Sequence, residues 1–153
     1  MTGATSAEFA RHAWDFRDAA LGAERLLGER DEYLLNASLP VAFLFGTCID
    51  LALRSYILAM DSSLTQFASP DCRHDLESLV DEASRLGLAR LIRVEAYDLQ
   101  MLRVLSQLRS KTTCEYSAVQ SEEIPIFDSM KKLSEKLLEI ACAMAGYERT
   151  TYE

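Results

Sequence analysis

A chain of 153 residues, nearly half of them apolar, is long enough for one compact domain with a buried core. Its 24 acidic and 16 basic residues give a formal net charge of −8, which disfavours non-specific nucleic-acid binding because that binding depends on neutralising phosphates. Three prolines and six glycines leave long stretches without a breaker, which favours helices over a β-rich architecture.

The cysteines and the first residues indicate a cellular compartment. Cys48, Cys72, Cys114 and Cys142 are scattered and form no CxxC pair, so we expect neither a disulfide framework nor a structural metal site. The start of the chain lacks the charged segment followed by an apolar one that marks a signal peptide. Both features predict a protein of the reducing cytoplasm.

The first predicted helix covers about residues 5–27, where apolar side chains recur at steps of three and four and therefore share one face. They are Phe9, Ala13, Phe16, Ala20, Ala23 and Leu27. Gly28 is expected to end this helix.

The second predicted helix covers about residues 37–61, with Tyr33 as an alternative earlier start and Pro40 in the first turn. It is apolar nearly all round, as a central helix would be. Residues 41–60 resemble a membrane span, but Asp50 and Arg54 lie near their centre, where each would cost roughly 2.5–3.5 kcal/mol. We therefore expect a buried helix of a bundle and no membrane partner.

Two further helices follow a loop at about 62–74. The third, about 75–86, has Asp75 or His74 near its N-cap and Gly87 after its end. The fourth, about 89–110, carries one apolar stripe of Val94, Tyr97, Met101, Val104 and Leu108, and a second of Leu91, Leu102 and Leu105. So wide an apolar surface predicts packing on two sides, inside the bundle and against another subunit.

The fifth predicted helix covers about residues 125–147, with Pro125 in its first turn and the residues from Glu148 onward frayed. Lys131, Lys132, Glu135, Lys136 and Glu139 are expected to be solvated on its outside. No segment predicts a strand. The fold class is therefore all-α: one five-helix bundle over residues 1–153, ordered at about 5–147, with loops at about 62–74 and 111–124 long enough to hold a site.

The sequence contains few of the motifs that bind metals or cofactors. The chain has two histidines, His12 and His74, and no Glu-x-x-His, the spacing that four-helix di-iron sites require. Asp71, Cys72 and His74 lack a second pair of ligands. Glycine-rich phosphate loops and nucleophile-elbow motifs are absent. We expect no metal and no cofactor.

Three charged residues lie on apolar helix faces and need partners. Asp50 and Arg54 are four apart, so they can pair on one helix face. They are interpreted either as a buried structural ion pair, the favoured alternative, or as a cleft in which Arg54 contacts an anion. Arg109 continues the stripe of Leu102 and Leu105, so it requires an acceptor or else extends outward at the helix end.

Two stretches resemble the HEPN (higher eukaryote and prokaryote nucleotide-binding) domains. IDLALRSYILAMD, residues 49–61, is similar to the second-helix pattern of that family, and RHDLESLVDEASRLGL, residues 73–88, is similar to its His-Asp-Leu segment. The resemblance covers most of the chain. It implies a homodimer, and a place among bacterial defence or toxin–antitoxin proteins, many of which are metal-independent ribonucleases.

The catalytic motif of HEPN nucleases is an arginine, four to six residues, then a histidine, often followed two positions later by tyrosine. RSKTTCEYS, residues 109–117, fits this frame with Arg109 and Tyr116, but Cys114 stands where histidine is expected. A thiol with a pKa near 8.5 exchanges protons less readily at neutral pH than an imidazole does. The resemblance therefore implies a degenerate motif.

These observations lead to two hypotheses. The first is a non-catalytic helical homodimer that binds a nucleotide, another anion or a partner protein, with ligand contacts from Asp50, Arg54, His74, Arg109, Cys114 and Tyr116. The alternative is a metal-independent endoribonuclease with an atypical site, in which the catalytic candidates are Arg109, Tyr116 and His74 and the ligand is RNA. A purely structural adaptor, working through the apolar surplus of the fourth helix, is a third interpretation.

Overall fold

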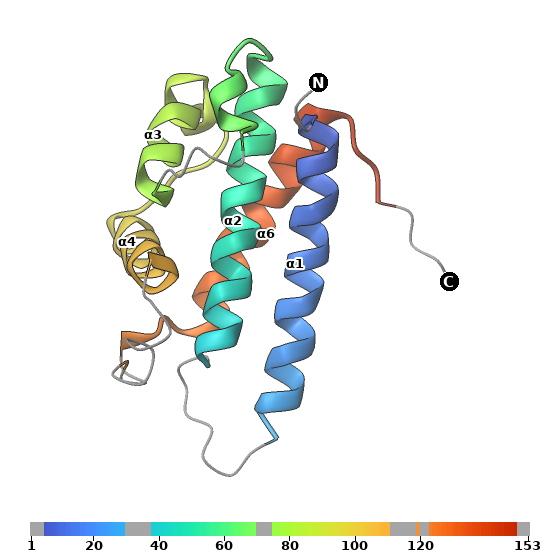
Figure 1. Ribbon diagram of the computed structural model, residues 1–153. Helices are drawn as coiled ribbons and strands as arrows, with labels where there is room; N and C mark the ends of the chain where they lie inside the picture. The colour runs from blue at the N-terminus through green and yellow to red at the C-terminus, as the bar shows by residue number, and fades with distance from the viewer. Residues whose placement is uncertain (1–4, 30–37, 70–74, 111–118, 120–122, 150–153) are drawn as a thin grey trace.

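The computed structural model describes residues 5–29, 38–69, 75–110, 119 and 123–149. These residues form five α-helices and two short 3₁₀ helices and contain no strand, which confirms the predicted all-α bundle (Figure 1). The elements are α1 (Ser6–Leu27), α2 (Leu39–Met60), η1 (Thr65–Phe67), α3 (Leu76–Arg85), η2 (Leu88–Arg90), α4 (Ala96–Ser110) and α6 (Phe127–Ala145).

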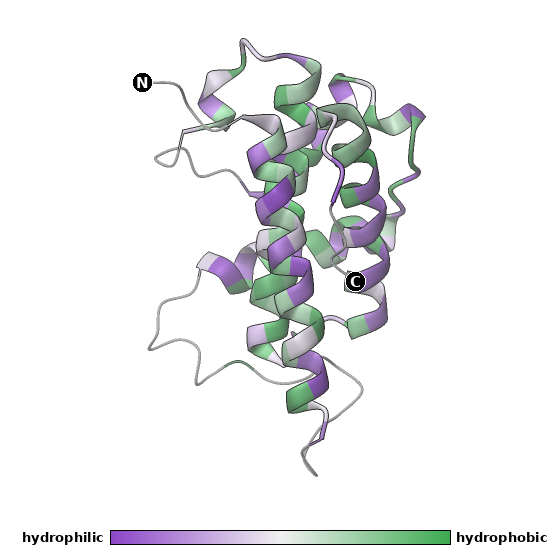
Figure 2. Cartoon of the chain, turned by 90° about the vertical axis from the view of Figure 1, so that its right-hand side faces the viewer, coloured by the Kyte–Doolittle hydropathy of each residue, from purple (hydrophilic) through white to green (hydrophobic). Residues whose placement is uncertain are grey.

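Helix α2 is the centre of the bundle, as its apolar composition predicts. It packs against α1 and α6 on one side and against α3 and α4 on the other (Figure 1). The helix is long and apolar enough to cross a membrane, yet 72% of its most apolar window is buried by the other elements. Hydrophilic and hydrophobic residues alternate along the helices, as expected for amphipathic helices around a core (Figure 2).

Local sequence signals account for most helix ends. Thr5 and Glu8 form a capping box at the start of α1, with the Glu8 N–H donating to Thr5 Oγ1 and the Thr5 N–H donating to Glu8 Oε2. Asp75 caps α3 by accepting from the Ser78 N–H at 2.7 Å. Gly87 and Gly146 follow α3 and α6 at φ values of 106° and 68°, which favour glycine. The predicted Asp75 and Gly87 positions are confirmed.

The predicted start of the fourth helix at residue 89 is wrong, because α4 begins at Ala96. After Gly87 the chain makes one 3₁₀ turn, which buries Leu88 and leaves Leu91 47% exposed. The Asp98 carboxylate accepts from the Glu95 N–H at 3.0 Å, which satisfies a donor at the true helix start. Apolar spacing alone does not predict the interruption between η2 and α4.

The predicted position of Pro125 in the first turn of the last helix is also wrong. Helix α6 begins at Phe127 with Ile126 at its N-cap, so Pro125 precedes the helix. The Ile126 carbonyl accepts from the N–H groups of Ser129 and Met130 at 3.2 and 3.3 Å, which marks the first turn.

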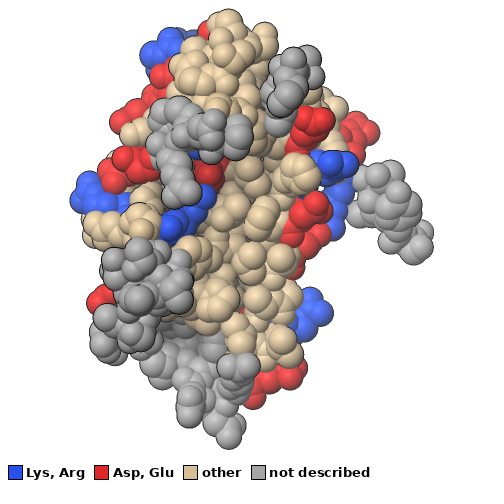
Figure 3. Space-filling view, viewed as in Figure 1, with Lys and Arg blue, Asp and Glu red and all other residues tan. Residues whose placement is uncertain are grey.

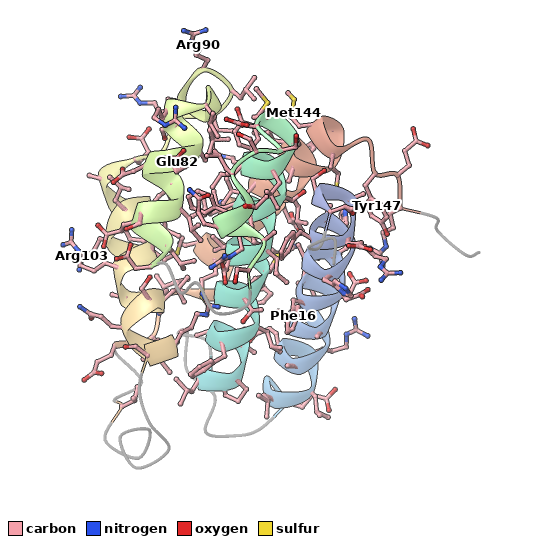
Figure 4. The ribbon with its side chains drawn as sticks, turned by 45° about the horizontal axis from the view of Figure 1, so that its top comes forward. Phe16, Glu82, Arg90, Arg103, Met144 and Tyr147 are labelled. Carbon is pink, nitrogen blue, oxygen red and sulfur yellow. The ribbon has the colours of Figure 1, made fainter. Side chains whose placement is uncertain are left out.

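The segment after α6 is bound to α1 as far as Arg149, where fraying was predicted. The Arg149 guanidinium forms an ion pair with Asp18 and lies 4.9 Å from the centre of the Trp14 ring. Arg17 lies 5.4 Å from the same ring and pairs with Glu135 of α6 at 2.7 Å. Tyr147 lies beside α1 in this segment (Figure 4). The interactions are long-range in sequence, so periodicity does not predict them.

Candidate functional site

The side chain of Asp50 joins two arginines from different helices. Its Oδ1 accepts from Arg54 Nε at 2.6 Å, and its Oδ2 accepts from Arg109 Nη2 at 3.0 Å. Asp50 and Arg54 belong to α2, and Arg109 lies in the last turn of α4. The three residues, called here the Asp50 cluster, carry a net charge of +1 (two arginines and one carboxylate).

Arg54 is the structural member of the cluster. Its side chain is 8% exposed, and its Nη1 donates to the carbonyl of Phe67 in η1 at 3.0 Å. A carboxylate and a carbonyl thus satisfy a charge that would be costly to bury alone. The geometry matches the favoured interpretation of Asp50 and Arg54 as a structural ion pair.

Arg109 is the reachable member. Its side chain is 24% exposed, compared with 13% for Asp50. Asp50 accepts from Nη2 alone, and within the described ranges no acceptor binds Nε or Nη1. Of the two interpretations of Arg109, an acceptor on the packed face or an outward extension at the helix end, the structure shows the first, with Asp50 as the acceptor. Its Nε and Nη1 are left as donors for a further anion.

Gly46 makes room for Arg109. It lies one turn before Asp50 on the same face of α2, and the three heavy atoms nearest to a Cβ at this position all belong to Arg109. The closest, Cδ, would be 2.7 Å away. A glycine inside an apolar helix costs about 1 kcal/mol relative to alanine, and the close passage of the arginine stem explains its presence here.

We expect the effect of Gly46→Ala on stability to depend on Arg109. In the wild-type background the new methyl group displaces Arg109 from Asp50, and the loss of this ion pair cancels the stability gained from the higher helix propensity of alanine. In an Arg109→Ala background the same change should raise the free energy of unfolding by about 0.5–1 kcal/mol. Urea unfolding of the four proteins, followed by circular dichroism, measures the difference. Equal effects in both backgrounds would contradict the proposed displacement.

Other contacts bring α3 to the same corner. The Leu76 N–H at the start of α3 donates to Ser106 Oγ at 2.9 Å, one turn before Arg109 on α4.

Of the residues predicted for the site, the structure brings Asp50, Arg54 and Arg109 together. His74, Cys114 and Tyr116 lie outside the described residues, as do Asp71 and Cys72. Sequence reasoning missed Gly46 and Phe67, although a glycine four residues before Asp50 was an available signal.

Two cysteines of the described residues are free thiols, Cys48 and Cys142. Burial raises the pKa of Cys48 to about 12, so its thiol stays protonated at neutral pH. Burial also raises the pKa of Cys142, whose Sγ accepts from Trp14 Nε1 at 3.0 Å. Neither thiol has the lowered pKa of a reactive nucleophile.

Cys48 should resist alkylation in the folded protein. We expect iodoacetamide at pH 8 to modify Cys142, which is partly exposed, at least tenfold faster than Cys48, which is 0% exposed. Peptide mass spectrometry over a time course measures both rates. In concentrated urea the two rates should converge, and similar rates in the native protein would contradict the burial of Cys48.

Comparison of the chain with models of known protein families gives no match, and comparison with curated proteins and with solved structures gives no significant match. The likeness to HEPN domains therefore rests on the motifs in the sequence.

Proposed function

We propose that this protein is a non-catalytic, HEPN-like helical homodimer that binds an anionic ligand, such as a nucleotide phosphate, at Arg109. The supporting observation is the charge balance of the Asp50 cluster. Asp50 neutralises one of two arginines, and Arg109 keeps Nε and Nη1 without an acceptor among the described residues. Nε and Nη1 lie on different edges of the guanidinium, so each can donate one charge-assisted hydrogen bond to a phosphate oxygen.

The residue at the motif position favours binding over cleavage. The cysteine at the position of the motif histidine removes the group best suited to exchange a proton near pH 7. This supports a binding role.

A charge-poor face next to the Asp50 cluster supports the dimer. Lys, Arg, Asp and Glu gather along the flanks of the molecule in Figure 3, and the strip over α2 and the adjoining side of α1 is nearly free of them. The outward side of α2 presents Leu44, Thr47 and Leu51, all partly exposed. A second copy of a chain with a net charge of −8 meets the least repulsion on such a face.

Oligomeric state tests the dimer. We expect sedimentation velocity at micromolar concentration to give a dimer for the wild type and a monomer for Leu44→Glu/Leu51→Glu. Leu91→Glu, which places a charge at a 47% exposed leucine elsewhere on the surface, should remain dimeric. A monomeric wild type would overturn the dimer, and equal effects of all these changes would overturn this face.

Calorimetric titration tests the ligand. We expect ATP to bind and adenosine not to bind, and Arg109→Ala to weaken ATP binding at least tenfold. Arg103→Ala is the matched control, because Arg103 lies on the same helix, points outward and pairs with Glu77 at 3.2 Å (Figure 4). ATP binding that survives Arg109→Ala, or no ATP binding, would overturn the site.

RNA cleavage separates this proposal from the nuclease alternative. Purified protein incubated with structured and single-stranded RNA in EDTA should leave both intact. Cleavage by the wild type that Arg109→Ala loses would instead establish a metal-independent endoribonuclease that works without the motif histidine.

A further inference from the structure

Two hollows that share Tyr97 lie beside α4, one against α6 and one against residues 123–126 that precede it, on residues that the Asp50 cluster does not use. The first, about 250 Å³, is lined at its basic side by Arg93, Lys132 and Lys136. The second, about 280 Å³, is lined mainly by Met101, Val104, Ile124 and Ile126. Tyr97 lines both, so its ring joins a basic hollow to an apolar one. Together they are called here the α4–α6 groove.

The basic hollow carries more cations than carboxylates. Its lining holds three cations and two carboxylates, a net charge of +1; Glu95 pairs with Arg93 at 3.2 Å, and Asp98, which accepts from the Glu95 N–H, keeps its negative charge. Within the described part of the chain, no carboxylate lies within ion-pair distance of Lys132 or Lys136. Like charges four apart on one helix repel each other, and an anion between them removes that repulsion.

Hydroxyl groups complete the polar end. Tyr97 Oη donates to Ser129 Oγ at 3.2 Å, which leaves the Ser129 hydroxyl hydrogen available for another acceptor. Ser129 lines the same hollow as the two lysines and lies one turn before Lys132 and two turns before Lys136 along α6. The polar end therefore presents two ammonium groups and a hydroxyl donor to one small space.

The apolar end exposes large side chains to water. Tyr97 is 54% exposed and Ile126 is 47% exposed, both among the most exposed large hydrophobic residues described. Glu123 also lines this hollow, so an anionic group is disfavoured at this end. The charges thus orient a ligand with its anion at the lysines and its apolar part over Tyr97 toward Val104.

We propose that the α4–α6 groove binds an amphiphilic anion: a single phosphate or carboxylate headgroup held by Lys132, Lys136 and Ser129, with an apolar chain over Tyr97 and between Val104 and Ile126. Each hollow, about 250 and 280 Å³, can hold one end of such a ligand, and Tyr97 lines both. The headgroup supplies the missing countercharge, and the chain covers the exposed apolar surface. This site is separate from Arg109 and does not depend on the function proposed above.

Titration calorimetry with decyl phosphate and decanoate, both below their micelle concentrations, tests the groove. We expect at least one to bind, while inorganic phosphate and acetate, which lack the chain, bind at least tenfold more weakly. Lys132→Ala/Lys136→Ala should weaken binding at least tenfold, and Tyr97→Ala should weaken it several-fold. The lysines are exposed, so these variants are expected to fold, which circular dichroism checks.

Matched controls separate the groove from non-specific attraction. Arg103→Ala/Lys131→Ala removes two cations from the same two helices outside the groove and should leave affinity unchanged. No binding of either amphiphile, equal losses in the groove and control double variants, or equal affinity for inorganic phosphate would each overturn the proposal.

Discussion

Replacing Asp50 with alanine should lower the free energy of unfolding by about 3 kcal/mol. The substitution leaves two arginines without their carboxylate, and one of them, Arg54, is only 8% exposed. A buried charge that loses its partner costs more than the pair contributed, because desolvation is no longer compensated. Urea unfolding monitored by circular dichroism at 222 nm measures the change.

An exposed pair provides the control for Asp50→Ala. Glu77 accepts from Arg103 with the two side chains 34% and 54% exposed, so Glu77→Ala should cost no more than about 1 kcal/mol. The triple variant Asp50→Leu/Arg54→Leu/Arg109→Met removes all three charges and should recover much of the loss. A cost for Asp50→Ala as small as that of Glu77→Ala would show that the arginines find water or other acceptors without it.

Phe45→Ala should destabilise the protein by about 3–5 kcal/mol, the range for truncating a fully buried aromatic side chain. Phe45 is 0% exposed in the first half of α2, and its ring lies 5.6 Å from that of Phe127 at an interplanar angle of 60°. Deletion of the ring leaves a cavity between α2 and the start of α6. The midpoint of urea unfolding should fall accordingly, with the far-ultraviolet spectrum of the folded state retained.

Two further variants show whether the cavity is the cause. Phe45→Leu retains much of the volume and should cost about 1 kcal/mol. Leu26→Ala removes a side chain that is 68% exposed and should change stability by less than about 0.5 kcal/mol. If Phe45→Ala and Leu26→Ala cost the same, the packing of α2 against α6 would not be what stabilises the bundle.

Local sequence patterns were enough to predict most of the fold. Apolar spacing at steps of three and four located all five described helices, and the nearly uniform apolar character of residues 41–60 identified the central one. Asp75 and Gly87 signalled the ends of α3 because capping depends on residues close in sequence. The same spacing continues through residues 89–95 and wrongly predicted helix there, whereas the Asp98 cap and the burial of Leu88 make α4 begin later, at Ala96.

The candidate site likewise contains one contact that the local sequence predicts and one that depends on helix packing. The pairing of Asp50 with Arg54 follows from a separation of four residues on one helix, which the chain specifies locally. For Arg109 the sequence left two alternatives, an acceptor on the packed face or an outward extension at the helix end, and the structure shows an acceptor. Its identity, a carboxylate 59 residues away, depends on how α4 crosses α2 beside Gly46.

The sequence by itself thus determined the helical segments, the central helix and the need for charge partners, because these depend on neighbours within one or two turns. Tertiary structure alone decided that Asp50 pairs with two arginines, that Arg149 is bound to α1, and that Lys132, Lys136 and Tyr97 line one hollow. These contacts join residues far apart in the chain. They depend on the packing of helices, which periodicity within one helix does not encode.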